Sequence, residues 1–240
     1  MTSETTTRFD GIEACVFDAY GTLFDVHSAV AQCRDRYGLE AGAASTMSDV
    51  WRTKQLQYTW LRALMGAKHH VDFWQVTGEA LDFALDTAFK DTDPPEGLRQ
   101  ALMDSYLTLH TYPEVPHVLK QLKDGGMNTA ILSNGAPEML GKVCDSTGIA
   151  SVLDAVLSVE EVGVFKPHPS IYQLAVDRLG VSAPSAISFQ SSNAWDAAAA
   201  SAFGFRVAWC NRFGQARERL PGSPDVELRS LDPLPVIVGL

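Results

Sequence analysis

Residues 12–22 read IEACVFDAYGT, an apolar run followed by a polar loop that contains a glycine. The apolar run Ile12–Phe17 is typical of a short buried strand, and it ends at Asp18. The loop Ala19–Thr22 is rich in residues that form turns. Further along the chain, apolar segments of strand length alternate with segments of helical periodicity. This alternation predicts βαβ units in a mostly parallel sheet.

A long helical block separates this first strand from the later ones. Apolar residues recur at helical spacing from Ser28 to His110, and the strand–helix alternation resumes after Thr111. Further strands are expected at Asn128–Leu132, Ala155–Val159, Ala186–Phe189 and Arg206–Cys210, which is expected to be the last, and residues 1–10 are expected to form a loose tail. The predicted fold is α/β, a Rossmann-like parallel sheet core (residues 1–25 and 111–240) with a helical cap domain (residues 26–110) inserted after the first strand.

The composition is that of an ordinary globular protein. The chain has 240 residues, of which 46% are apolar and 20% charged, and this excludes a disordered or collagen-like chain. The net charge of −10 argues against a general nucleic-acid or membrane binder, although a local pocket can still bind a small anionic substrate. The four cysteines are scattered without metal-site spacing. Neither a signal peptide nor a membrane span is expected, so a cytoplasmic location is predicted.

Polar side chains follow the ends of several of these apolar segments. Because the carboxyl ends of parallel strands open into one crevice, we expect these side chains to converge there. Each of them taken alone also fits a turn, a helix cap or a surface position, so it is their convergence that indicates a site. They are Asp18 and Thr22 after the first strand, Ser133 and Asn134 after the second, Lys166 in the loop before the Pro169–Leu179 helix, and Ser191, Asn193 and Asp196 after Ala186–Phe189.

The same segments resemble the four motifs of the haloacid dehalogenase superfamily. Phe17–Phe24 is similar to the first motif and Ser133-Asn134-Gly135 to the second, while Lys166-Pro167 and Ser191–Asp196 are similar to the third and fourth. The resemblance covers about residues 11–235 and puts residues 26–110 in the position of the family's cap. Two segments, Trp51–Leu61 and SSNAWD at 191–196, are more narrowly similar to the L-2-haloacid dehalogenases, or (S)-2-haloacid dehalogenases, than to the more numerous phosphatases.

This resemblance implies hydrolysis of short-chain (S)-2-haloalkanoates to (R)-2-hydroxyalkanoates and halide, without a metal or other cofactor. Asp18 would attack C2 with inversion and form an aspartyl ester, which water would then hydrolyse. Lys166 would hold the Asp18 carboxylate, and Asp196 would either activate the water or orient Lys166. The implied catalytic residues are Asp18, Thr22, Arg52, Ser133, Lys166, Ser191, Asn193 and Asp196. The implied substrate-binding residues are Ala19, Tyr20, Arg52, Leu56, Phe73, Ser133, Asn134, Tyr172 and Trp195, with Arg52 and Asn134 on the halide side.

Two departures from the superfamily's phosphatases argue against phosphoryl transfer. The phosphatases carry a second aspartate in the first motif that protonates the leaving group, whereas Tyr20 stands there in this chain, and a halide leaves without a proton. The fourth motif has Ser192 where an aspartate is common, which leaves few carboxylates for Mg²⁺. A small-metabolite phosphatase is therefore the less favoured hypothesis, and an activity insensitive to EDTA would exclude it.

The substrate of such a nucleophile stays open on the sequence alone. The same aspartate could open a different C2–X bond of a small carboxylic acid, including fluoroacetate or a cyclic amino acid, and a non-catalytic binding protein is a further hypothesis. His69 and His70 lie just before Phe73, and a hydrogen-bond donor near the halide would favour fluoride. Thr53 follows Arg52 where relatives often have glutamine. The resemblance also implies a homodimer formed through the cap helices.

Overall fold

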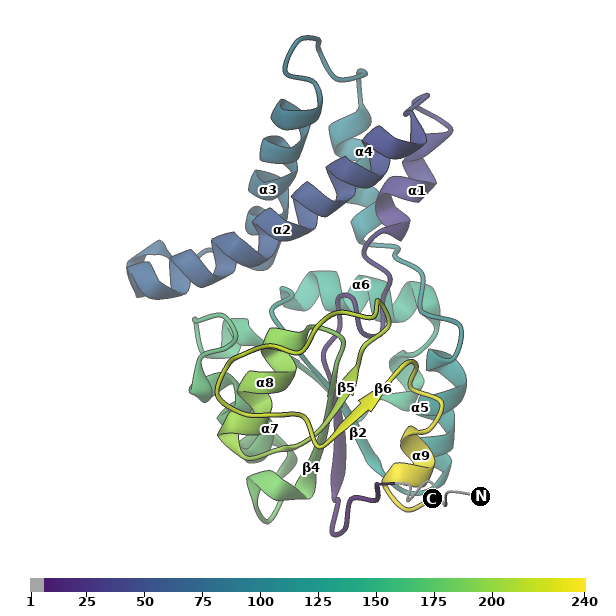
Figure 1. Ribbon diagram of the computed structural model, residues 1–240, viewed down its shortest axis with the longest axis vertical. Coiled ribbons are helices and arrows are strands. Elements are labelled where there is room, and N and C mark those ends of the chain that lie inside the picture. Colours follow the sequence, from purple (N-terminus) through teal and green to yellow (C-terminus); the bar gives the residue numbers. More distant parts are fainter. Residues whose placement is uncertain (1–6) are drawn as a thin grey trace.

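The computed structural model describes residues 7–240, and a six-stranded parallel sheet forms the centre of the fold (Figure 1). The strand order is β3-β2-β1-β4-β5-β6, so β1 (Ala14–Phe17) is hydrogen-bonded on both sides. The other strands are β2 (Asn128–Ser133), β3 (Ala155–Ser158), β4 (Ile187–Ser191), β5 (Arg206–Cys210) and β6 (Val226–Leu228). All four residues of β1 are buried, as expected for a parallel strand that is covered on both faces.

Helices cover both faces of the sheet. Figure 1 shows α7 (Pro169–Leu179) and α8 (Ala194–Phe203) on one side, with α5 (Val115–Asp124) and α9 (Leu234–Ile237) on the other. α6 (Pro137–Thr147) packs against β3. Local sequence sets both ends of α7, because the side chain of His168 accepts a hydrogen bond from Ser170 N and the helix stops at Gly180, whose φ is +63°.

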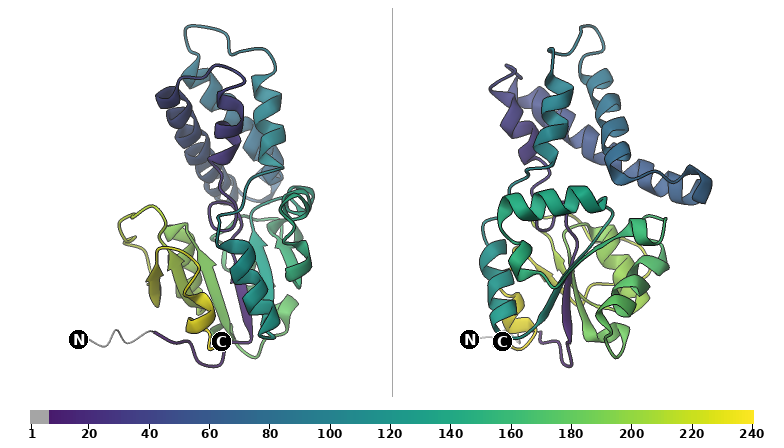
Figure 2. Two further views of the ribbon diagram at one scale, coloured as in Figure 1. Left: turned by 90° about the vertical axis from the view of Figure 1, so that its right-hand side faces the viewer. Right: turned by 180° about the vertical axis from the view of Figure 1, so that it is seen from behind.

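Four further helices form a separate layer over the carboxyl edge of the sheet (Figure 2). They are α1 (Ser28–Arg34), α2 (Ala41–Met65), α3 (Phe73–Ala88) and α4 (Leu98–Tyr106). α2 and α3 each begin with an acidic N-cap, because Glu40 accepts from Ala43 N and Asp72 accepts from Gln75 N. α2 packs along α3, and α1 packs against α4. The buried side chains inside this layer include Trp51, Phe73, Leu81, Leu102 and Tyr106. The predicted fold class is therefore confirmed.

Two chain segments connect the cap helices to the sheet, and they lie side by side. Asp25 N donates to His110 O at 2.8 Å, and Phe24 forms an antiparallel bridge with Thr111. We call these two segments, residues 24–25 and 110–112, the neck. The neck supports our proposal that the cap domain spans residues 26–110.

The sequence-based prediction was wrong at both ends of the chain. Arg206–Cys210 is not the last strand, because β6 pairs with β5 in parallel at the edge of the sheet. β6 has only three residues and is therefore too short to show the alternation by which strands are recognised. The predicted loose tail is wrong at Phe9, which is buried and whose N–H donates to Ile237 O at 2.8 Å. Residues 1–6 of that tail lie outside the described residues.

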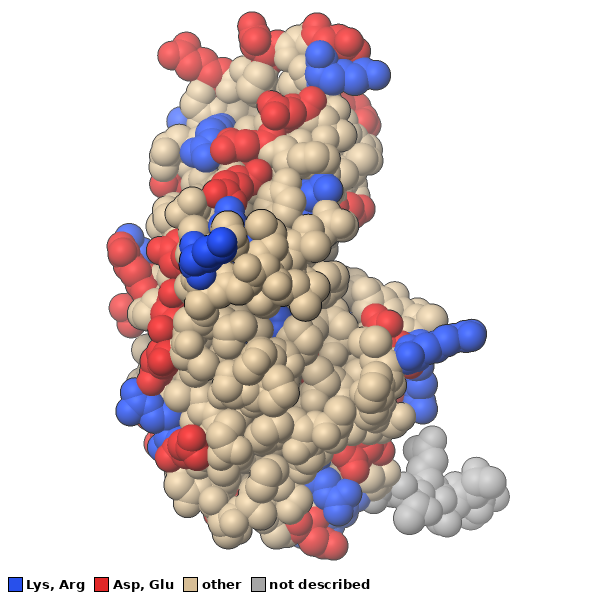
Figure 3. All heavy atoms as spheres, turned by 90° about the vertical axis from the view of Figure 1, so that its left-hand side faces the viewer, with Lys and Arg blue, Asp and Glu red and all other residues tan. Residues whose placement is uncertain are grey.

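The surface agrees with the acidic composition. Figure 3 shows charges of both signs scattered over one face, with acidic side chains gathered over the cap and no continuous basic area among the residues described there. That face therefore lacks the clustered Lys and Arg side chains that bind nucleic-acid phosphates. Within residues 7–240, no helix has both the length and the apolar character needed to cross a membrane.

Candidate active site

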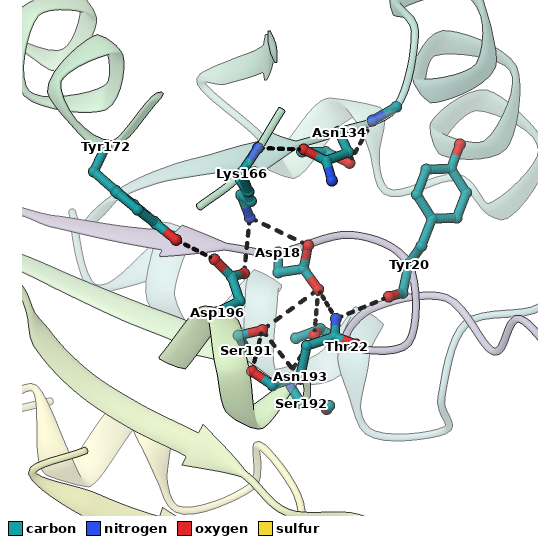
Figure 4. Close-up of polar contacts among 12 residues, drawn as sticks. Asp18, Tyr20, Thr22, Asn134, Lys166, Tyr172, Ser191, Ser192, Asn193 and Asp196 are labelled. Atoms are coloured by element: carbon teal, nitrogen blue, oxygen red, sulfur yellow. Dashed lines mark hydrogen bonds and ion pairs between the residues drawn. The ribbon is translucent and has the colours of Figure 1, made fainter. Parts of the chain in front are cut away.

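The polar residues that the sequence singles out meet at the carboxyl edge of the sheet, below the cap (Figure 4). Asp18 follows β1, while Ser133 and Ser191 are the last residues of β2 and β4, the two neighbours of β1. Lys166 comes from the loop between β3 and α7, and Asp196 lies in the first turn of α8. The strand order therefore assembles one site from segments that are far apart in the sequence.

The Asp18 carboxylate is buried and accepts hydrogen bonds on both oxygens. Its Oδ2 accepts from Asn193 Nδ2 at 2.7 Å, from Thr22 Oγ1 at 2.9 Å and from Ser191 Oγ at 3.5 Å. Its Oδ1 accepts from Lys166 Nζ at 3.3 Å. These donors stabilise the ionised form of a carboxyl group that is otherwise costly to bury. Oδ1 has fewer protein partners than Oδ2, so it is the oxygen with the more available lone pair.

Lys166 places a buried cation between two carboxylates. Its side chain is 1% exposed, and Nζ lies 2.9 Å from Asp196 Oδ2 and 3.3 Å from Asp18 Oδ1. Nζ also lies 5.0 Å from the centroid of the Phe189 ring. Burial alone would lower the pKa of Lys166, but the attraction of Asp196 and Asp18 outweighs it and raises the pKa above its ordinary value. The amine therefore stays protonated at neutral pH.

Asp196 is fully buried, and both of its oxygens have partners. Oδ2 accepts from Lys166, and Oδ1 accepts from the hydroxyl of Tyr172 at 2.7 Å. Burial raises the pKa of the Asp196 carboxyl, and the Lys166 charge beside it opposes this change. Burial also raises the pKa of Tyr172, so the phenol keeps the proton that it donates. The structure thus places Tyr172, expected beside the substrate, with its hydroxyl on Asp196 and its ring packed near Phe189.

Ser133 and Asn134 shape the loop that follows β2. Asn134 Oδ1 accepts from the backbone N–H of Lys166 at 2.9 Å and so ties this loop to the lysine loop. Ser133 Oγ accepts from Gly135 N at 3.0 Å. Since the Ser133 hydroxyl acts as an acceptor in that bond, its own proton is available to a bound anion.

The cap reaches the site through Arg52 of α2. Arg52 Nη2 donates to Tyr20 O at 3.0 Å and to Asn193 Oδ1 at 3.1 Å, and Asn193 in turn donates to Asp18. Gly21 in this loop has a φ of +92°, a backbone conformation that favours glycine. A guanidinium group from the cap thus sits directly against the loop that carries Asp18.

Aromatic side chains from the cap and the core enclose the space beside this loop. The Tyr20 ring lies 5.7 Å from the Phe73 ring, measured between centroids, so two of the predicted substrate-binding residues are in contact. Trp195 of α8 packs edge-on against Trp60 of α2 at 5.3 Å. Leu56 is half-buried one turn after Arg52 on α2.

Comparison with known proteins identifies the family. The family described as haloacid dehalogenase-like hydrolase matches residues 12–204. (S)-2-haloacid dehalogenase 1 from Pseudomonas sp. strain CBS-3 is 44% identical over 231 residues, which cover 95% of this chain and 97% of that protein. The chain belongs to the (S)-2-haloacid dehalogenase family.

Solved structures of the family agree with this fold. A crystal structure of a dehalogenase has a TM-score of 0.90 and 43% identity, covering 96% of this chain and 99% of that one. The L-2-haloacid dehalogenase from Xanthobacter autotrophicus, solved with chloropropionic acid covalently bound, has a TM-score of 0.84 and 37% identity, covering 94% and 98%. The predicted family, and with it the prediction that the protein is an enzyme, is confirmed.

Sequence reasoning missed two side chains that shape the site of this dehalogenase-family protein. Tyr106 of α4 stacks on Tyr20 at 5.4 Å, and its hydroxyl donates to Gln55 Oε1 at 3.2 Å. Trp60 packs on Trp195. Tyr106 and Trp60 both lie at positions that fit the apolar face of a helix. Helical periodicity alone does not tell whether such a ring packs inside the cap or faces the site.

The two histidines of this dehalogenase-family cap lie at its boundary with the core. His70 Nε2 is 3.1 Å from Glu160 Oε2, and its ring is 4.7 Å from that of Phe165, the residue before Lys166. The backbone carbonyl of His69 accepts from Arg62 Nη1 at 2.9 Å. A cavity of about 280 Å³ opens beside His70, lined in part by Arg62, His70 and His168. His70 therefore bridges cap and core.

The donor set of the site does not fit a divalent metal ion. Residues 7–240 contain no group of three or more His, Cys, Asp or Glu side chains arranged to hold a metal. The Lys166 ammonium already lies between Asp18 and Asp196. Mg²⁺ prefers several oxygen ligands in octahedral geometry, and a protonated amine between the two carboxylates opposes such binding.

Replacing Gly135 with alanine is expected to displace the Tyr20 ring. A Cβ at Gly135 would lie 2.7 Å from Tyr20 Cε2 and 3.0 Å from Leu140 Cγ. We expect the free energy of unfolding to fall by about 1–3 kcal/mol because the added methyl group overpacks this contact. Urea denaturation measures the change.

Gly141→Ala provides the matched control for this substitution. Gly141 lies inside α6, and nothing is within 4 Å of the position a Cβ would take. Alanine there should stabilise the protein by about 0.4–1 kcal/mol, through the unfolded chain. Equal stabilisation by both substitutions would contradict the close contact between Gly135 and Tyr20.

Proposed function

We propose that this protein hydrolyses short-chain (S)-2-haloalkanoates to (R)-2-hydroxyalkanoates and halide, with Asp18 as the nucleophile. The observation that carries the proposal is the buried Asp18 carboxylate, which accepts hydrogen bonds from Lys166 and from three neutral donors. Tyr20 stands two residues after Asp18, and burial raises the pKa of its phenol far above neutrality. A halide needs no proton to leave, so a site without an acid at this position suits a halide leaving group.

In the first step, Asp18 Oδ1 attacks C2 of the substrate. A bond forms between Oδ1 and C2 while the carbon–halogen bond breaks, and the halide leaves with the bonding electron pair. The three donors on Oδ2 support this assignment, because they leave Oδ1 with Lys166 as its protein partner. Attack from the face opposite the halogen inverts the configuration at C2.

In the second step, water attacks Cγ of the Asp18 ester. The bond between Cγ and Oδ1 breaks, and Oδ1 takes up one proton of the water and leaves as the hydroxyl oxygen of the product, while the water oxygen enters the carboxylate and its other proton goes to a base. Esterification removes the charge of Asp18, and Asp196 is then the remaining carboxylate on Lys166. Burial raises the pKa of Asp196, and a less acidic carboxyl is a better proton acceptor. We therefore propose that Asp196 orients Lys166 in the resting enzyme and accepts the proton of the attacking water.

The remaining site residues bind the two ends of the substrate. We propose that Ser133 and the backbone N–H groups of Ala19 and Tyr20 bind the substrate carboxylate, and that Arg52 and Asn134 stabilise the charge on the departing halide. The position of Arg52 against Tyr20 O and Gly21 supports this assignment, because it brings a cation to the side of the loop that the cap covers. Leu56, Phe73 and Trp195 would supply the apolar wall.

We also propose that the reaction needs no metal ion. The place of Lys166 between Asp18 and Asp196 supports this, since the ammonium supplies the positive charge that a metal would supply to a nucleophilic carboxylate. Halide release in excess EDTA should therefore equal release in its absence.

A single turnover in H₂¹⁸O tests the ester intermediate. With enzyme in excess over (S)-2-chloropropionate, we expect ¹⁸O in the side chain of Asp18 and an unlabelled hydroxyl group in (R)-2-hydroxypropionate. Mass spectrometry of the peptide that contains Asp18, and of the product, measures both. A labelled product in the first turnover, with an unlabelled peptide, would show that water attacks C2 directly and would refute the proposed mechanism.

A further inference from the structure

Arg212 is a second buried cation near the loop that follows Asp18, residues 19–22, which we call the nucleophile loop. None of the steps above uses this arginine. It follows β5, and its side chain is 8% exposed. Burying a guanidinium group is costly unless specific partners compensate for the lost water. The groups that contact the Arg212 guanidinium therefore indicate which parts of the chain this side chain positions.

The guanidinium group of Arg212 has three contacts, on two separate segments of the chain. Nη2 donates to the backbone carbonyl of Thr22 at 2.9 Å, in the loop that follows Asp18. Nη1 lies 2.5 Å from Oε1 of Glu114, the N-cap residue of α5. The Arg212 Cζ atom lies 3.9 Å from the centroid of the Tyr112 ring, which belongs to the neck. One side chain thus joins the nucleophile loop, the neck and the start of α5.

Thr22 connects Arg212 to the nucleophile. The fully buried Thr22 donates from Oγ1 to Asp18 Oδ2 at 2.9 Å, and the same oxygen accepts from Ser192 N at 2.8 Å. The direction of the Thr22 hydroxyl follows from the orientation of its backbone, which Arg212 holds through the carbonyl. Arg212 therefore acts on Asp18 through one intermediate residue.

The neck contacts both Arg212 and the residue that follows the nucleophile loop. Tyr112 N donates to the carbonyl of Leu23, the residue after Thr22, at 3.1 Å, and the Arg212 guanidinium group lies over the Tyr112 ring. Two buried polar atoms, Arg212 Nε and the Tyr112 hydroxyl, have no hydrogen-bond partner within the described chain. Such unpaired groups lower stability, so packing stability alone does not account for a charged side chain here.

We propose that Arg212 is a positioning residue for the dehalogenation proposed above, on which this inference rests. It fixes Thr22, and through Thr22 the Asp18 carboxylate, relative to the neck that carries the cap. It does so without touching the substrate or the reacting atoms.

Arg212→Met tests the proposal, with Arg212→Lys as the conservative variant. We expect kcat for halide release to fall about 10- to 100-fold in Arg212→Met, because small displacements of a reacting group have effects of this size. KM should change less than about threefold, since the substrate contacts are untouched. Arg212→Lys keeps a cation in this place but not the planar group that reaches Thr22 O and Glu114 together, so it should recover only part of kcat.

Arg206→Met is the matched control. Arg206 starts the same strand, β5, but it is half exposed and pairs with Asp225 at 2.9 Å. Arg206→Met should leave kcat and KM unchanged. A kcat for Arg212→Met within about twofold of the wild type would overturn the proposal.

Thr22→Val tests the intermediate residue of this connection. It removes the hydroxyl that donates to Asp18 Oδ2, so kcat should fall while KM changes less than about threefold, as in Arg212→Met. The double variant Arg212→Met/Thr22→Val should be no slower than the slower single variant, because both substitutions act on the same hydrogen bond.

A readout without turnover distinguishes failure of this inference from failure of the proposed function. The amide N–H of Ser192 is bonded to Thr22 Oγ1, so its hydrogen exchange reports whether Thr22 is in place. We expect faster exchange at Ser192 in folded Arg212→Met than in the wild type and in Arg206→Met. Unchanged exchange would overturn the role of Arg212 even if the enzyme releases halide. Faster exchange in Arg212→Met, together with a wild-type protein that releases no halide, would support the role of Arg212 and refute the proposed function.

Discussion

Asp18→Asn is expected to reduce halide release from (S)-2-chloropropionate by at least about 10⁴-fold, as removal of a covalent nucleophile does in other hydrolases. An amide oxygen carries no full negative charge and is a poor nucleophile at carbon. The substitution keeps the size of the side chain and an acceptor for Thr22 and Asn193, so the fold should persist. Initial rates of chloride release, in EDTA and with the (S) and (R) isomers compared, measure the effect.

Asp177→Asn is the control for this experiment. Asp177 is exposed on α7 and accepts from Gln173 one turn earlier, so its loss should leave the rate unchanged. Substantial activity in Asp18→Asn, with unfolding free energy equal to the wild type, would contradict the proposed nucleophile. Activity on phosphate esters with Mg²⁺, but none on 2-haloalkanoates, would favour the phosphatase hypothesis.

Lys166→Met should have the largest effect on stability. Removing the ammonium leaves Asp18 and Asp196 buried without their shared cation, and breaking a buried ion pair costs about 3–5 kcal/mol. Halide release should fall with it, because Asp18 loses the cation that is bonded to Oδ1 and orients the carboxylate. Urea denaturation measures the stability, and initial rates measure the activity.

Two further variants test whether the loss of the Lys166 charge causes the lower stability of Lys166→Met. Lys120→Met removes an exposed lysine that pairs with Asp124, and it should change stability by at most about 0.5 kcal/mol. Adding Asp196→Asn to Lys166→Met removes one of the two uncompensated carboxylates and should recover about 1–3 kcal/mol. If the double variant is less stable than Lys166→Met, repulsion between the carboxylates is not what destabilises the single variant.

The same lysine predicts a pH dependence of stability. Its pKa in the folded protein lies above the ordinary value of 10.5, because Asp196 and Asp18 favour the charged form. The stabilisation is therefore complete below this value and is lost as the pH rises through the folded pKa. The unfolding free energy of the wild type minus that of Lys166→Met should be constant near neutral pH and should decrease above about pH 10.5.

Much of the fold follows from local sequence signals. β5 and α7 have the predicted bounds, because the first is an apolar run and the second lies between Pro169 and Gly180. β6 and α9 escaped prediction because each is only three or four residues long and depends on packing against elements distant in the sequence. The burial of Phe9 depends in the same way on Ile237, near the other end of the chain.

The site was predictable as a set of residues but less so as a set of contacts. Polar residues at strand ends point to one edge of a parallel sheet, which brought Asp18, Lys166 and Asp196 together correctly. The sequence does not show which of several nearby groups a side chain will hydrogen-bond. The hydrogen bond from the Tyr172 hydroxyl to Asp196 was therefore not predicted. Tyr106 and Arg212 were not singled out, because neither lies in a recognisable motif.

The neck bears on how such a protein can change over evolution. Residues 25 and 110 are one hydrogen bond apart, so the chain leaves the sheet and returns to it at nearly one point. The entropy of closing a loop between such points grows only slowly with the length of the loop. The segment inserted at the neck could therefore be a short turn, a different helical bundle or the present cap. The sheet and its four polar loops would stay unchanged in each case. The sheet core and the cap can thus diverge separately from each other.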